Sequence, residues 1–184
     1  DLGLGIEAFE VTNQRYQWCS VAGKCPEPLV KLSSFYDSGK ARYPVTGVDA
    51  WQAAIFCKWI GRRLPTLAQW ERATEPGRLP WNDQGPGPGQ ANLCFDCEDS
   101  TGAAQEVGSH PTGAIGGVHD MIGNVSEWTR TEMDDNMQPG EDWSGENPQT
   151  MPNQVAIVGG SFRSTPNEQL YMNRASGVPK EDIG

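Results

Sequence analysis

The sequence is short of basic residues. Its 184 residues include 14 lysines and arginines against 24 aspartates and glutamates, which gives a formal net charge of −10 and a pI near 4.6. Proteins that bind nucleic acid need basic side chains to neutralise phosphates. We therefore expect no nucleic-acid partner, and an anionic membrane surface is disfavoured for the same reason.

Long hydrophobic runs are also missing. The longest run, Ala53–Cys57, is far shorter than the roughly 18 apolar residues that a membrane-spanning helix needs. We therefore expect no transmembrane segment. The chain opens at Asp1 without the basic and apolar regions of a secretion signal, so we expect any leader to be absent from this chain.

Glycine and proline are abundant instead. With 22 glycines and 14 prolines they make up nearly a fifth of the chain, whereas about 12% is usual. Turn-forming residues that recur without a period exclude a helical bundle, a coiled coil and a collagen-like fibre. Seven Trp, five Phe and four Tyr residues indicate a buried core, so we expect one compact, loop-rich domain over residues 1–184.

The five cysteines form two close pairs and one single residue, Cys57. The segment from Cys19 to Cys25 holds a glycine and is followed by a proline, so it can turn tightly enough to bring the two sulfurs within bonding distance. We expect a disulfide there, with a reduced buried pair as the alternative. Cys57 lies in an apolar stretch and is expected to be a small buried hydrophobic residue.

The second pair, Cys94 and Cys97, has the C-x-x-C spacing. This spacing suits a structural disulfide, a redox dithiol or half of a zinc site. Glu98 and Asp99 follow and would raise the thiol pKa, and the chain has only two histidines to complete a zinc site. We expect a structural disulfide. Two disulfides predict a secreted or periplasmic location.

Capping residues predict three short helices. In two of them a glutamine three residues after the cap completes a capping-box pattern. The expected helices begin after Asp49 and end near Gly61, begin after Thr66 and end near Thr74, and begin after Thr12 and end near Gly23. Strand patterns cover Leu4–Val11, Pro44–Val48 and Val155–Phe162.

The segment from Thr131 to Thr150 contains six acidic residues and no Lys or Arg. Acidic runs of this kind are usually solvated, so a solvated insertion is the expected structure. Contact with a partner through Trp143, or an extra cation site, is the alternative.

Several motifs, in order, resemble one family. They are Glu10–Asn13, the R-L-P-T-x-x-x-W-E motif that begins at Arg63, the G-N-V-x-E-W motif that begins at Gly123, and Val158–Phe162. Their order and spacing resemble the formylglycine-generating enzyme (sulfatase-modifying factor) family from about Glu10 to the end of the chain. The resemblance implies an α+β, C-type-lectin-like fold that is rich in loops, with few short helices and small antiparallel sheets. That family continues into a closing Gly-Phe-Arg strand, so the domain is expected to be incomplete at its C-terminal edge.

The resemblance also implies calcium as a cofactor, an ion that prefers oxygen ligands. The first implied ion is held by the side chains of Asp120 and Glu127 and the carbonyl groups of Gly123 and Val125. The second is held by the side chains of Asn92 and Asp99 and the carbonyl groups of Leu93 and Thr101. The alternative is that these acidic residues are merely solvated.

The catalytic residues that the resemblance implies are missing. Active members of the family use two cysteines after the G-G-S motif to hold copper, and thiolates suit Cu(I). Ser164 and Gln169 stand at the matching positions, and no cysteine occurs after Cys97. A related branch holds iron with three histidines, but this chain has only His110 and His119. We therefore predict no catalytic residue.

The sequence thus predicts a non-catalytic, calcium-stabilised module that acts outside the cytoplasm. Its expected partner is another protein or a larger secreted assembly; a carbohydrate ligand has no support in the sequence. The candidate binding cleft is formed by Ser161, Arg163, Ser164, Gln169 and Arg174. The alternative is an oxidoreductase of the same family with altered active-site chemistry.

Overall fold

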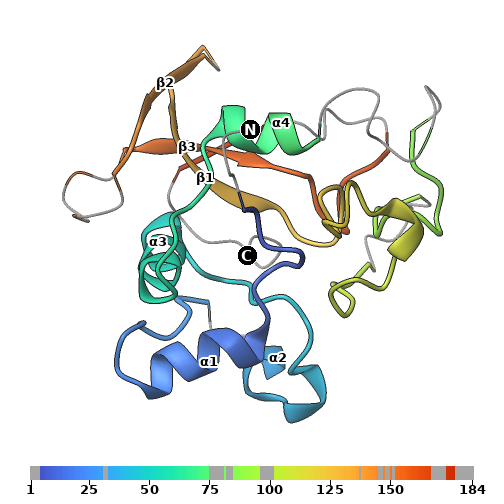
Figure 1. The fold of residues 1–184 in the computed structure, drawn as a ribbon, viewed down its shortest axis with the longest axis horizontal. Coiled ribbons are helices and arrows are strands. Elements are labelled where there is room, and N and C mark those ends of the chain that lie inside the picture. The colour runs from blue at the N-terminus through green and yellow to red at the C-terminus, as the bar shows by residue number, and fades with distance from the viewer. Residues whose placement is uncertain are drawn as a thin grey trace.

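A computed structural model describes residues 5–30, 33–74, 81, 85–95, 102–136, 138–144, 147, 150, 152–166 and 173–176. Within these residues the chain forms short helices and one small antiparallel sheet (Figure 1). The helices are α1 (Asn13–Val21), α2 (Ser33–Tyr36), α3 (Ala50–Trp59) and α4 (Leu67–Ala73), with single 3-10 turns at Ser38–Lys40 and Pro111–Gly113. The strands are β1 (Glu127–Met133), β2 (Pro139–Asp142), β3 (Gln154–Val158) and β4 (Asn173–Ser176). This is the expected loop-rich α+β class.

The three predicted helices are confirmed as α1, α3 and α4. Asp49 caps α3 and Thr66 caps α4, each within a complete capping box. Thr12 caps α1, and its hydroxyl accepts a hydrogen bond from the Arg15 amide. These signals lie within a few residues of each helix start, so they can be recognised without knowledge of tertiary contacts.

The strand predictions are less accurate. The sheet has the order β2-β1-β3-β4, and Trp128 in β1 faces Ile157 in β3. The predicted strand Val155–Phe162 ends at Val158, because Gly159 and Gly160 adopt φ of 86° and 68°, which no extended strand can accommodate. Strands β1, β2 and β4 were not predicted.

Two predicted strands are wrong. Residues 5–11 and 44–48 form no strand, and their neighbourhood contributes only an isolated bridge between Thr12 and Pro44. The Val45 amide donates to the Val11 carbonyl at 2.8 Å, but Pro44 has no N–H for a ladder. The chain then turns at Gly47, whose φ is 76°.

The acidic segment from Thr131 to Thr150 is partly sheet. It contains the end of β1 and all of β2, which project from the body of the fold (Figure 1). All four residues of β2 are exposed, whereas Trp143 is only 5% exposed and packs in the core with Trp128. The hypothesis of partner contact through Trp143 is therefore wrong, because the indole ring is buried.

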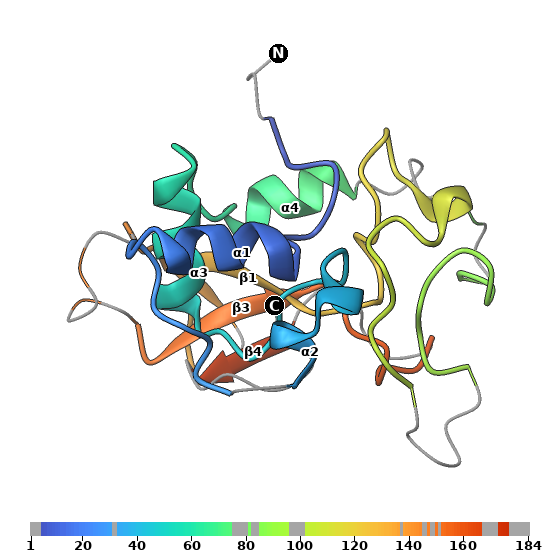
Figure 2. The same ribbon diagram turned by 90° about the horizontal axis from the view of Figure 1, so that it is seen from below.

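The core lies between the helices and the sheet. Helices α3 and α4 pack against β1, and α1 packs against α3 (Figure 2). Trp70 of α4, Trp128 of β1 and Tyr16 of α1 are almost fully buried, each in a separate apolar cluster. No helix among the described residues has the length and hydrophobicity to span a bilayer.

The predicted disulfide between Cys19 and Cys25 is confirmed, with their Cα atoms 5.2 Å apart. It links Cys19 in α1 to Cys25 in the loop that follows this helix. Cys94 is also disulfide-bonded, whereas Cys97 lies outside the described residues. Cys57 is a free thiol that packs at the edge of the core.

Candidate functional site

The residues of the first implied calcium site form a turn with left-handed backbone before β1. Asp120 and Asn124 adopt φ of 56° and 60°, and Gly123 between them adopts 86°. Glycine enters this region freely, and asparagine and aspartate enter it more often than other residues do. A Cβ atom on Gly123 would lie 2.6 Å from the carbonyl oxygen of Asn92, so the turn can approach Asn92 only because residue 123 is glycine.

Two carboxylates of this turn point into the protein. Asp120 is 8% exposed, and its Oδ2 accepts a hydrogen bond from the Gly108 amide at 2.5 Å. Glu127 lies at the start of β1, where its Oε2 accepts the Trp70 indole N–H at 2.9 Å. The hydrogen-bond donors to these two carboxylates, Gly108 and Trp70, thus come from two other segments of the chain.

A third carboxylate, that of Glu10, is buried and contacts the same turn. Its Oε1 accepts the Val125 amide at 3.1 Å and its Oε2 accepts the Asn124 side-chain amide at 2.6 Å. Burial, followed by the charges of Asp120 and Glu127, raises the pKa of Glu10 well above its usual value. Glu10 lies in one of the family motifs, but no local pattern shows its role, because its partners lie more than 100 residues away.

Burial also affects the other two carboxylates. It raises the pKa of Glu127 to about 7; the hydrogen bond from Trp70 opposes this shift, and the charge of Asp120 adds to it. Burial raises the pKa of Asp120 too, against the hydrogen bond from Gly108. Buried carboxylates that repel one another are stabilised by a cation between them.

The donor set fits calcium. Calcium takes six to eight oxygen ligands and accepts carboxylate and carbonyl oxygens together. Among the described residues no three His, Cys, Asp or Glu side chains converge at metal-binding distance. An ion here would therefore complete its shell with backbone carbonyls, which the resemblance assigns to Gly123 and Val125.

The second implied calcium site is only half described, since Asp99 and Thr101 lie outside the described residues. Asn92 donates its side-chain amide to the Asn124 side chain at 2.9 Å, and its carbonyl accepts the Asn124 amide at 2.8 Å. Leu93 follows Asn92 and is buried. The two implied sites are thus connected directly through Asn92 and Asn124.

The candidate binding cleft is a tight turn where it is described. Ser161 is buried, and its amide donates to the Ser164 hydroxyl at 3.0 Å. Arg163 is exposed, and its guanidinium lies 5.2 Å from the ring centre of Phe162. Arg174 belongs to β4, where it pairs with Ala156 of β3. Gln169 lies outside the described residues.

A cavity of about 730 Å³ lies between residues 5–11, α3, α4, residues 115–121 and β1, and Glu10, Val125 and Glu127 are among its lining residues. Ser161, Arg163 and Ser164 are not among its described lining residues. Cys57 lines it, and burial raises the pKa of that thiol to about 12. His119 also lines it, with Phe9 stacked on its ring at 4.7 Å. Residues of the Glu10–Asn13 motif and of the motifs that begin at Arg63 and Gly123 line this cavity, but the sequence alone does not show that these separate segments enclose one space.

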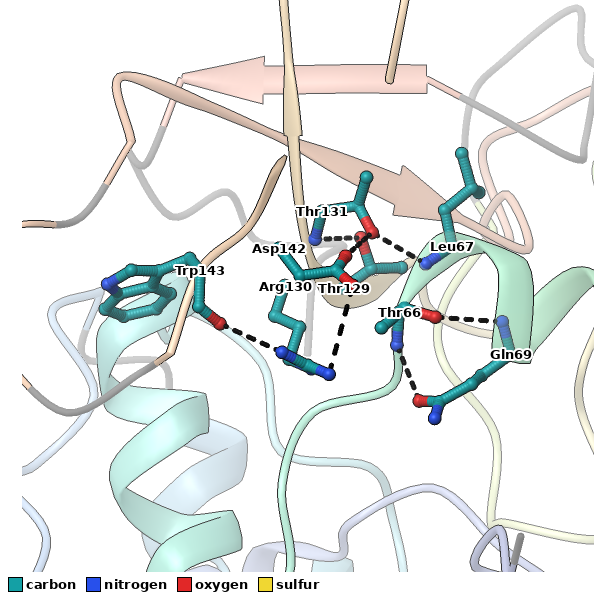
Figure 3. Close-up of polar contacts among 8 residues, drawn as sticks. All are labelled: Thr66, Leu67, Gln69, Thr129, Arg130, Thr131, Asp142 and Trp143. Atoms are coloured by element: carbon teal, nitrogen blue, oxygen red, sulfur yellow. Dashed lines mark hydrogen bonds and ion pairs between the residues drawn. The ribbon is translucent and has the colours of Figure 1, made fainter. Parts of the chain in front are cut away.

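A polar network ties the acidic segment to α4 (Figure 3). The Thr131 hydroxyl accepts the Leu67 amide at 2.9 Å and donates to the Asp142 carboxylate at 2.7 Å. Arg130 donates to the Trp143 carbonyl at 3.4 Å and lies 3.9 Å from Asp142. Asp142 is therefore engaged by protein groups and is not simply solvated.

The sequence matches the model of one protein family, the sulfatase-modifying factor enzyme 1-like domain, over residues 3–183. The chain belongs to this family. It is 35% identical over 136 residues to the formylglycine-generating enzyme of Mycobacterium tuberculosis, a match that covers 67% of this chain and 44% of that protein. It is also 32% identical over 104 residues to inactive C-alpha-formylglycine-generating enzyme 2 of Bos taurus, covering 50% of this chain and 34% of the relative.

Among solved structures, PvdO from Pseudomonas aeruginosa shares the fold. The TM-score is 0.68 at 24% sequence identity, and the match covers 96% of this chain and 76% of PvdO. The sulfatase-modifying factor family thus includes proteins named as enzymes and one named as inactive. This chain spans less than half the length of both curated relatives.

Proposed function

We propose that this domain is a non-catalytic, calcium-stabilised module that binds another protein or joins a larger assembly outside the cytoplasm. The observation that carries the proposal is the chemistry at the two positions where the family's active members place copper-binding cysteines. Ser164 and Gln169 occupy them. A hydroxyl and an amide are poor ligands for Cu(I), which prefers thiolates.

The cysteines that the structure describes do not supply thiolates in their place. Cys19, Cys25 and Cys94 are disulfide-bonded, and the pKa of Cys57 is raised to about 12. A thiol with that pKa is protonated at neutral pH and is a weak nucleophile and ligand. Disulfides also support a secreted or periplasmic location.

Calcium would be held by the Asp120 and Glu127 side chains and the Gly123 and Val125 carbonyls. Its role would be structural: a divalent cation neutralises carboxylates that are buried together and fixes the turn before β1. An ion that binds only the folded state stabilises it by mass action.

Calcium removal tests this part of the proposal. We expect EDTA to lower the melting temperature of the purified protein, and excess calcium to restore it. Asp120→Asn should reduce the rise in melting temperature that calcium produces. Glu106→Gln changes an exposed carboxylate paired with Arg42 and should leave that rise unchanged. A melting temperature that is the same with and without EDTA would contradict calcium stabilisation.

The second candidate function is an oxidoreductase with altered chemistry in the same fold. The relatives named as enzymes favour it, as does the cavity of about 730 Å³, since sites for small molecules commonly have volumes of 300–1,000 Å³. Metal analysis distinguishes the two functions. Stoichiometric copper or iron that cycles with a thiol reductant would exclude the non-catalytic module, whereas calcium alone would support it.

A further inference from the structure

We propose that Glu10 is a positioning residue for calcium, which holds the Asn124–Val125 part of the turn in its ion-binding shape without itself contacting the ion. The inference rests on the proposed calcium site and adds a residue that no motif assigns to it. It depends on hydrogen bonds that span 114 and 115 residues of the chain.

Both oxygens of Glu10 accept a hydrogen bond from the turn. Oε1 accepts the Val125 amide and Oε2 accepts the Asn124 side-chain amide. Glu10 is 7% exposed, so water does not compete well for these bonds. A carboxylate whose two oxygens hold the backbone and side chain of the turn acts on the ion through the turn.

The turn has an uncommon backbone conformation that its neighbours hold in place. Asn124 has a φ of 60°, in the left-handed region, which asparagine enters more readily than most residues but which stays a minority conformation. Its side-chain oxygen accepts hydrogen bonds from Asn92 and Gln105, and its side-chain nitrogen donates to Glu10. The surrounding structure therefore fixes a conformation that an isolated chain would avoid.

The position of Val125 is what connects Glu10 to the ion. The hydrogen bond that the Val125 amide donates to Glu10 fixes the peptide group between Asn124 and Val125. The next carbonyl along the chain is that of Val125, the implied ligand. Groups that orient metal ligands typically change metal affinity 10–100-fold when they are mutated.

The test is a calcium titration of Glu10→Gln. Glutamine keeps the size of the side chain but replaces one acceptor oxygen by a donor, which would face the donor groups of Val125 or Asn124. We expect the calcium dissociation constant to rise at least 10-fold. Glu106→Gln is the matched control, because it removes the same charge from an exposed ion pair with Arg42, and it should bind calcium within twofold of the wild type.

Two readouts separate positioning from mere fold stability. The first is terbium, whose emission Trp70 should sensitise because its indole contacts Glu127. The second is the difference in melting temperature between excess calcium and EDTA. A purely structural role would lower both melting temperatures equally, whereas positioning reduces the difference.

The outcomes are distinct. Wild-type affinity in Glu10→Gln, or a variant that stays unfolded in saturating calcium, would overturn the role of Glu10. A variant that is unfolded in EDTA but refolds with calcium at a midpoint at least 10-fold above that of the wild type would support it. If the wild-type protein itself binds neither calcium nor terbium, the proposed calcium site fails rather than the assignment of Glu10 alone.

Discussion

Single residues decide the shape of the turn before β1. Gly123 and Gly116 both adopt positive φ, at 86° and 59°, but their surroundings differ. A Cβ atom on Gly123 would meet the Asn92 carbonyl at 2.6 Å, whereas nothing lies within 4 Å of one on Gly116. Substitution of Gly116 therefore tests the cost of the left-handed backbone alone, whereas substitution of Gly123 tests that cost together with a steric clash.

This pair gives a prediction at the residue scale. Gly116→Ala should lower the free energy of unfolding by about 1 kcal/mol, the cost of left-handed backbone alone. Gly123→Ala should lower it by about 3 kcal/mol, because the Asn92 carbonyl must also move away. Urea denaturation of both variants checks this. Equal losses would show that the approach to Asn92 does not constrain residue 123.

At the scale of elements, α1, α3 and α4 follow from the sequence, whereas α2 and most of the strands do not. A capping box involves residues only three positions apart, so the sequence alone predicts the boxes of Asp49 with Gln52 and of Thr66 with Gln69. A strand needs a partner, and the partners of β1 lie in the acidic segment and in β3. The charge of that segment predicted a solvated loop. Part of β1 nevertheless alternates between buried and more exposed positions, as a strand does.

The capping box of α3 provides the prediction at this scale. Asp49→Ala removes the acceptor for the Gln52 amide, a 2.7 Å hydrogen bond, and should lower the free energy of unfolding by about 1 kcal/mol. Asp49→Asn is the control, since asparagine keeps an acceptor and caps helices about as well. Thermal or urea unfolding measures both, and a loss in Asp49→Asn equal to that in Asp49→Ala would assign the effect to charge rather than to capping.

At the scale of the whole molecule, covalent links and buried side chains stabilise a chain with long loops. The disulfide between Cys19 and Cys25 closes a short loop after α1, and Cys19 is fully buried beside Tyr16. Such a link stabilises the folded protein mainly by restricting the unfolded chain.

Removing that link gives the last prediction. The double substitution Cys19→Ala with Cys25→Ala should lower the free energy of unfolding by about 2 kcal/mol, the value expected for a loop of this length. The measurement is urea denaturation under oxidising conditions. The single substitution Cys57→Ala is the control for loss of a sulfur without loss of a link, and a similar loss in both variants would contradict a contribution from the disulfide.

The sequence by itself determined the family, the α+β class, the helix starts and the Cys19–Cys25 disulfide. It also determined that Ser164 and Gln169 replace the cysteines of active relatives. All of these are properties of residue types at short spacings, which the order of the chain specifies directly. Only the tertiary structure decided where strands pair, that Trp143 is buried, and that Glu10 holds Asn124 and Val125. Burial and long-range hydrogen bonds arise from segments that meet only after folding, and for that reason no local pattern contains them.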